Sequence, residues 1–121
     1  MVKLLTILSI VFCVGIAQGS WACPMLEKAN PKVGSVVEIS PEVVEIKFST
    51  KIFPDSSTLD VFDPTGHKVN VGKPYGKEGD DTMILTKVNI HTPGRYKVQW
   101  NVFCDCGAMT PGEYKFDVGT P

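Results

Sequence analysis

The chain has 121 residues, which is enough for one domain with a modest core and too few for two. Its 12 basic and 13 acidic side chains nearly balance, and no basic block occurs, so nothing in the charge pattern favours nucleic acid or anionic lipid as a partner. Apolar residues make up 43% of the chain, which is the share of an ordinary folded domain rather than a disordered segment.

The first 22 residues have the layout of a secretory signal peptide. Lys3 supplies a positive start, residues 4–17 are almost wholly apolar, and small residues follow. The apolar run is short for a membrane span, which makes an uncleaved anchor or a buried helix the less favoured alternative. We therefore expect an exported protein, periplasmic or secreted.

Two cleavage points fit this segment, after Gly19 or after Ala22. The second leaves Cys23 as the new N-terminus and is favoured, so the folded domain is expected to span residues 23–121. Removal of Lys3 with the signal leaves 11 basic and 13 acidic side chains, a net charge of −2. A lipid anchor on Cys23 is less favoured, because the bulky Trp21 lies just before the cut.

After the signal, the hydrophobic period is two rather than 3.6. Apolar and polar side chains alternate through residues 42–49, 95–102 and 113–118, which predicts strands with one face in the core. Shorter candidate strands span residues 26–29, 36–39, 58–63, 67–71 and 82–88. Residues 72–81 are rich in Gly, Lys and Asp and predict a longer polar loop.

These elements predict an all-β fold of one domain. About seven short strands in roughly 100 residues, with turns between them, favour an immunoglobulin-like Greek-key β-sandwich. No segment shows a clear amphipathic helical pattern. Trp100 is expected to be a central core residue.

The cysteines of the mature chain are odd in number. Cys13 lies in the signal, which leaves Cys23, Cys104 and Cys106. At least one thiol must therefore stay free, bridge to another molecule or bind something. An exposed thiol without a function is open to unwanted oxidation in an oxidising compartment, so we expect these cysteines to have a role.

Five stretches of the mature chain carry motifs in a characteristic order and spacing. Residues 23–34 contain a leucine followed by a Pro-x-x-Gly turn, and residues 92–102 contain a Pro-Gly-x-Tyr-x-Val-x-Trp strand. Together with residues 41–49, 63–69 and 112–118, these stretches resemble the CopC family of periplasmic copper-binding proteins. The resemblance spans nearly the whole mature chain and implies a small copper-binding β-sandwich.

The departures from the family fall at its metal site. The family's usual Cu(II) ligands are an N-terminal histidine and an Asp-Gly-His sequence after the tryptophan strand. In the family's register, Cys23 stands at the first histidine, Cys106 at the aspartate and Ala108 at the second histidine. The family's Cu(II) site therefore does not carry over to this chain.

The replacements are sulfur-bearing. Cys104, Cys106 and Met109 lie on one short stretch, and if it continues the tryptophan strand the two cysteines share a face. The resemblance implies that the mature N-terminus lies beside this stretch, which would add Cys23. Thiolate and thioether ligands favour Cu(I), and thiolates also suit zinc. Cys23, Cys104, Cys106 and Met109 are therefore the predicted metal ligands.

A purely structural role for the cysteines is the alternative. Cys23 could form a disulfide with Cys104 or Cys106 and join the N-terminus to the sandwich. A bridge between Cys104 and Cys106 is disfavoured, because two residues on one extended strand give poor disulfide geometry. Met25 could be a thioether ligand, but a role in the core is the commoner one for methionine. His67 and His91 lie beside turns, where a solvated side chain is the ordinary outcome.

Enzymatic activity is not predicted. No phosphate-binding loop, His-Glu-x-x-His motif or nucleophile elbow occurs, and no motif places either histidine beside a cysteine. Two functions remain. One is a copper carrier or buffer that passes Cu(I) to a membrane transporter or another periplasmic copper protein. The other is a metal-free, disulfide-stabilised β-sandwich that acts as a binding or structural module.

Overall fold

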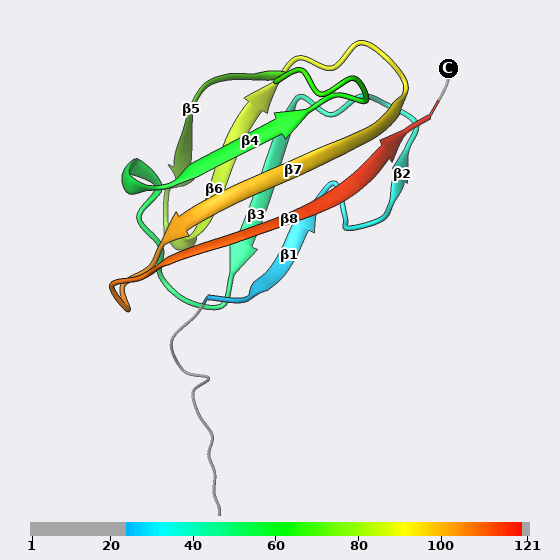
Figure 1. Cartoon of the computed structure of the whole chain (residues 1–121). Coiled ribbons are helices and arrows are strands. Elements are labelled where there is room, and N and C mark those ends of the chain that lie inside the picture. The colour runs from blue at the N-terminus through cyan, green and yellow to red at the C-terminus, as the bar shows by residue number, and fades with distance from the viewer. Residues whose placement is uncertain (1–23, 120–121) are drawn as a thin grey trace, which may run out of the picture.

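Within residues 24–119, eight strands and one short 3-10 turn make up the fold (Figure 1). The computed structural model describes residues 24–119; the predicted signal peptide, both cleavage points and Cys23 lie outside the described residues. The strands are β1 (Leu26–Asn30), β2 (Val36–Val37), β3 (Val43–Phe48), β4 (Thr58–Phe62), β5 (Asn70–Lys77), β6 (Asp80–Val88), β7 (Gly94–Phe103) and β8 (Met109–Val118), and the 3-10 turn η3 is Pro54–Ser56. Within these residues, no helix is long and apolar enough to span a bilayer.

The strands form two four-stranded sheets that pack face to face (Figure 1). One sheet has the order β1-β3-β6-β5 and the other the order β2-β8-β7-β4. The chain crosses between the sheets after β1, β2, β3, β4 and β6, as in a Greek-key sandwich. The predicted all-β, immunoglobulin-like sandwich is confirmed, and the candidate strand at residues 36–39 is present as the two-residue β2.

The core lies between the two sheets and follows the alternation read from the sequence. Every second residue is buried in β3, in β7 from Tyr96 onward and in β8 from Tyr114 onward. The buried side chains of these three strands are Val44, Ile46, Phe48, Tyr96, Val98, Trp100, Val102, Tyr114, Phe116 and Val118. The ring of Trp100 meets that of Phe48 edge-on across the two sheets, with centroids 5.8 Å apart. The expected core position of Trp100 is confirmed.

A hydrogen bond of a kind common in such sandwiches fixes the start of β7. The hydroxyl of Tyr96 donates to the backbone carbonyl of Thr92, four residues upstream, at 2.6 Å. This is the tyrosine corner of immunoglobulin-like folds. It holds the connection from β6 in place and so fixes where the long strand β7 begins.

The predicted polar loop over residues 72–81 is wrong. In the structure β5 and β6 form a hairpin that turns at Gly79, whose φ is +85°. Strand β5 lies at the edge of its sheet, is mostly exposed, and loses register at two places along β6. An edge strand with few buried side chains need not alternate, so its sequence has the composition of a loop.

The first strand is tied to both sheets. It pairs antiparallel with β3, and the buried hydroxyl of Tyr114 on β8 donates to the carbonyl of Pro31 at 2.7 Å. Burial raises the pKa of Tyr114, which keeps this hydroxyl a donor. These contacts fix the beginning of the described chain at the end of the sandwich where β7 finishes (Figure 1).

Candidate metal centre

The cysteine loop, residues 104–108, joins β7 to β8 at one end of the sandwich. Strand β7 ends at Phe103, and Cys104 then pairs with Ile52 in an isolated bridge. The chain reverses within four residues, because the Gly107 N–H donates to the Cys104 carbonyl at 2.9 Å. Gly107 has a φ of +87°, a conformation that glycine adopts without strain. The tryptophan strand therefore ends before the cysteines, and the condition under which the two would share a strand face is not met.

A disulfide joins Cys104 to Cys106 within this turn. The expectation that these two cysteines do not pair is therefore wrong. Residues two apart on an extended strand would lie about 6.6 Å apart with parallel side chains. The turn brings the two Cα atoms to 5.2 Å, near the usual separation for a disulfide.

The two sulfur residues differ in exposure. Cys104 is fully buried at the edge of the core, whereas Cys106 and the rest of the loop are exposed. Met109, the first residue of β8, is 47% exposed and pairs in register with Phe103. Of the predicted ligands inside the described chain, the structure thus joins Cys104 and Cys106 and places Met109 where β8 leaves the same loop.

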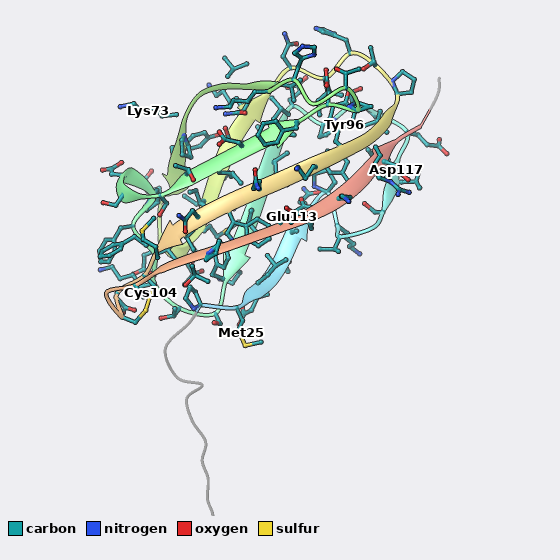
Figure 2. All side chains as sticks on the ribbon, viewed as in Figure 1. Met25, Lys73, Tyr96, Cys104, Glu113 and Asp117 are labelled. Carbon is teal, nitrogen blue, oxygen red and sulfur yellow. A yellow bond between two sulfur atoms is a disulfide. The ribbon has the colours of Figure 1, made fainter. Side chains whose placement is uncertain are left out.

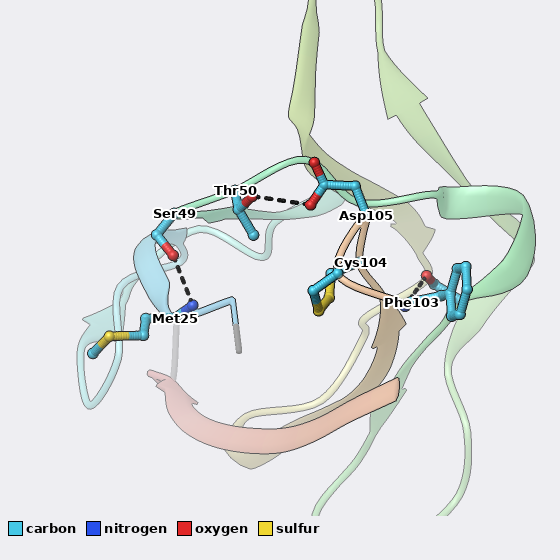
Figure 3. The surroundings of a disulfide bond; sticks show 8 residues. Met25, Ser49, Thr50, Phe103, Cys104 and Asp105 are labelled. Atoms are coloured by element: carbon cyan, nitrogen blue, oxygen red, sulfur yellow. Dashed lines mark hydrogen bonds between the residues drawn. A yellow bond between two sulfur atoms is a disulfide. The ribbon is translucent and has the colours of Figure 1, made fainter. Parts of the chain in front are cut away.

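The start of the described chain borders the cysteine loop through one shared segment, residues 49–52 (Figure 3). The backbone of Met25 accepts from the Ser49 N–H at 2.9 Å and donates to the Ser49 hydroxyl at 2.9 Å. On the other side, the Thr50 hydroxyl donates to the Asp105 carboxylate at 3.3 Å. The first described residues therefore lie beside the segment that contacts the cysteine loop, and Cys23 lies outside the described residues.

Met25 does not occupy the core, which overturns the role favoured for it. Its side chain is 69% exposed and points away from Cys104 (Figure 3). The register shift between Leu26 and Lys28 in β1 breaks the alternation that would have predicted its direction. Its thioether is therefore exposed beside residues 49–52.

The histidines lie far from the sulfur residues. His67 and His91 are exposed and come from the loops beyond the other end of β7, near Gly94. Figure 2 shows Cys104 at the end of the sandwich opposite Tyr96 and Asp117. The His67 ring is hydrogen-bonded to the Thr65 hydroxyl at 2.8 Å, within a turn organised by Asp63. Neither histidine can complete a site at the cysteine loop without rearrangement.

The CopC domain family matches residues 26–119, nearly all of the described chain. This chain belongs to the CopC family. The match covers both sheets and includes the cysteine loop.

A relative of this chain is a copper transport protein. The copper transport protein CutJ of Bacillus subtilis (strain 168) is 24% identical over 114 residues, which are 93% of this chain but 21% of CutJ. The chain therefore spans about a fifth of that relative's length.

Solved structures share the fold. CopC from Methylosinus trichosporium OB3b superposes with a TM-score of 0.74 at 26% identity, covering 79% of this chain and 93% of that one. PcoC, a methionine-rich copper resistance protein from Escherichia coli, has a TM-score of 0.67 at 20% identity, covering 79% and 98%. The second similarity supports the sandwich architecture alone.

The candidate metal-binding atoms at the cysteine loop are sulfur atoms. Among residues 24–119, no group of three or more histidine, cysteine or acidic side chains is arranged to hold a metal ion. What the described residues offer at the cysteine loop is two cysteines in a disulfide and the nearby thioether of Met109. Such donors fit a soft ion once the disulfide is reduced, and do not fit a Cu(II) site of nitrogen and oxygen ligands.

Proposed function

We propose that this chain is an exported copper-binding protein that carries or buffers Cu(I) through a sulfur site at the cysteine loop. The observation that carries the proposal is the close pairing of Cys104 and Cys106 at one end of a CopC-family sandwich. Soft thiolates favour Cu(I) over the harder ions. Zinc is a second ion that thiolates accept, and it serves as the competitor in any binding test.

Each proposed ligand has its own role. Reduced Cys104 and Cys106 would supply the two thiolates, and Met109 would add a thioether from the start of β8. Cys23 would complete the site from the chain's mature N-terminus, where its amine and thiolate could both bind. The hydrogen bonds of Met25 to Ser49 support this arrangement, because they hold the chain that follows Cys23 beside the loop.

Export belongs to the same proposal. Cleavage after Ala22 would release a mature chain that begins at Cys23, in the periplasm or outside the cell. The end of the sandwich that carries the loop is exposed at Cys106 and Met109, which suits exchange of an ion with another protein. A membrane copper transporter or another periplasmic copper protein would be the receiving partner.

A metal-free module is the second candidate. The disulfide between Cys104 and Cys106 favours it, because oxidised cysteines cannot bind copper as thiolates. In that case the chain keeps the CopC sandwich and uses its surface for binding alone.

Counting thiols distinguishes the two functions. The exported protein is purified without reductant, its intact mass is measured to locate the first residue, and its thiols are labelled before and after mild reduction, with and without Cu(I). A carrier should show three thiols after reduction that Cu(I) protects from labelling, in a chain that starts at Cys23. A disulfide that mild reductant leaves intact, or thiols that Cu(I) leaves fully reactive, would support the module.

A further inference from the structure

The two halves of the disulfide face different surroundings. Cys104 has no exposed surface and packs with the core residues between the sheets. Cys106 is exposed, as are its neighbours Asp105 and Gly107. A thiol arriving from solvent can therefore reach the sulfur of Cys106, whereas the core covers that of Cys104.

The loop that carries the disulfide closes on itself. Two backbone hydrogen bonds, from the Gly107 N–H to Cys104 and from the Cys104 N–H to Ala108, hold the turn without the sulfurs. The Asp105 N–H donates to the Lys51 carbonyl at 3.2 Å and anchors the turn to the neighbouring segment. Opening the disulfide thus leaves both cysteines attached to a turn that is fixed by other contacts.

We propose that the Cys104–Cys106 disulfide is a thiol-exchange site that external thiols enter at Cys106. We further propose that reduction of this disulfide enables copper binding. This second part of the proposal rests on the proposed function. The substrate class is a thiol or dithiol, either a small molecule or a cysteine pair of a partner protein.

The exchange balances in two steps. The thiolate of an external thiol attacks the Cys106 sulfur and forms a mixed disulfide, and Cys104 leaves as a thiolate that takes up a proton. A second external thiolate then attacks the external sulfur of the mixed disulfide, which yields an external disulfide and the Cys106 thiolate. Two electrons pass from the external thiols to the protein, whose cysteines become a dithiol able to bind Cu(I).

The reverse reaction fits the same asymmetry. In the reduced protein, an external disulfide is attacked by the accessible Cys106 thiolate, and Cys104 then resolves the mixed disulfide. Reactivity of a cysteine follows its access and its thiolate fraction, so the buried Cys104 should react slowly with external reagents. Cys106 is therefore the residue expected in any mixed disulfide.

The experiment measures which cysteine forms the mixed disulfide. Cys104→Ser and Cys106→Ser are each made in a Cys23→Ser background, reduced, and exposed to oxidised glutathione, and the rate of mixed-disulfide formation is followed by mass. We expect the Cys104→Ser protein, which keeps Cys106, to react about tenfold faster or more. Equal rates, or faster reaction of Cys104, would overturn entry at Cys106.

A second measurement uses the wild-type protein and does not depend on how the variants fold. The reduced protein is alkylated with a limiting amount of iodoacetamide, and peptide mapping compares the label on Cys106 with that on Cys104. More label on Cys106 than on Cys104 is expected, and equal label or more label on Cys104 overturns the proposal. The switch is tested with Cu(I) added to the oxidised and reduced forms.

The outcomes separate the two proposals. Exchange at Cys106 with Cu(I) bound only by the reduced form supports both. Exchange at Cys106 without copper binding by either form leaves the exchange site standing and contradicts the copper function and its switch. Equal copper binding by the two forms contradicts the switch, whatever the exchange rates.

Discussion

The indole ring of Trp100 lies against the backbone of Gly112 on the neighbouring strand. The two residues are partners in the β7–β8 register, and a Cβ atom at position 112 would come within 2.5 Å of the ring. Because the ring is buried between the sheets, it cannot move away freely. Glycine at this position is therefore required by the tryptophan rather than by the backbone conformation.

We predict that Gly112→Ala lowers the free energy of unfolding by about 1–3 kcal/mol, the usual cost of overpacking a core. Denaturant unfolding followed by tryptophan fluorescence measures this directly. Glu113→Ala is the matched control, because Glu113 is the next residue of β8 and is exposed. The control should stay within about 0.5 kcal/mol of the wild type. Unchanged stability of Gly112→Ala would contradict the packing described here.

The carboxylate of Asp80 is the acceptor in a group of hydrogen bonds from two neighbouring strands. Its carboxylate accepts from the Thr82 hydroxyl, from the Thr82 N–H at 3.0 Å and from the Lys47 ammonium at 2.9 Å. These bonds hold the pKa of Asp80 below its ordinary value of 3.8. The hydrogen bond from the Thr82 hydroxyl is the largest cause, and the hydrogen bond from Lys47 is the next largest. These bonds connect β6 to β3 on the outer face of their sheet.

A carboxylate whose pKa is lower in the folded state than in the unfolded chain stabilises the fold at pH values above its ordinary pKa. This stabilisation is lost as the pH falls through the lowered pKa of the folded state. We therefore predict that the wild type loses more stability between pH 6 and pH 3 than Asp80→Asn does. Urea unfolding at both pH values measures the difference, with Asp55→Asn as a control that removes an exposed carboxylate from η3. An equal loss in the wild type and Asp80→Asn would show that this carboxylate does not stabilise the fold.

At the scale of elements, the β7–β8 hairpin holds the cysteine loop. The two strands pair in continuous register from Gly94 with Val118 to Phe103 with Met109. The disulfide spans a sequence separation of two, so it removes little freedom from the unfolded chain. The hairpin, rather than the disulfide, therefore keeps the loop in place.

We predict that reduction of the disulfide lowers the free energy of unfolding by less than about 2 kcal/mol, because the closed loop is so short. Thermal unfolding with and without a reductant measures the change. Loss of the folded state on reduction would instead assign the disulfide a mainly structural role and weaken the case for an exchange site.

The elements also show what a sequence can predict. Strands buried on one face, such as β3 and β7, could be predicted from their alternation, because the core imposes it. Strand β5 could not, since an exposed edge strand needs no buried face. The disulfide in the cysteine loop could not be predicted for a different reason. The Cys104–Cys106 pairing depends on where β7 ends, and the bridge to Ile52 and the turn at Gly107 decide that.

At the scale of the whole molecule, the two ends of the sandwich differ. One end carries the cysteine loop, Met109 and the start of the described chain at Met25. The other end carries the tyrosine corner of Tyr96 and both histidines. The resemblance to the CopC family is the reason for placing the proposed site at the first of these ends. The candidate sulfur donors could be identified from the sequence, but the disulfide between Cys104 and Cys106 could not.

Copper binding is the property on which the proposed function depends. The direct measurement is an anaerobic titration of the reduced mature protein with Cu(I) against a competing chelator. Wild type, Cys104→Ser/Cys106→Ser and Met83→Leu are compared, because Met83 is a buried sulfur residue away from the loop. Circular dichroism shows whether each variant is folded.

We predict that the wild type and Met83→Leu bind Cu(I) in a saturable, stoichiometric way and that the double variant does not. Residues that merely support metal ligands cost about 10–100-fold in affinity when changed, so loss of both thiols should cost more than about 100-fold. Binding by the folded double variant at the wild-type level, or no binding by the reduced wild type, would contradict a thiolate copper site at the cysteine loop.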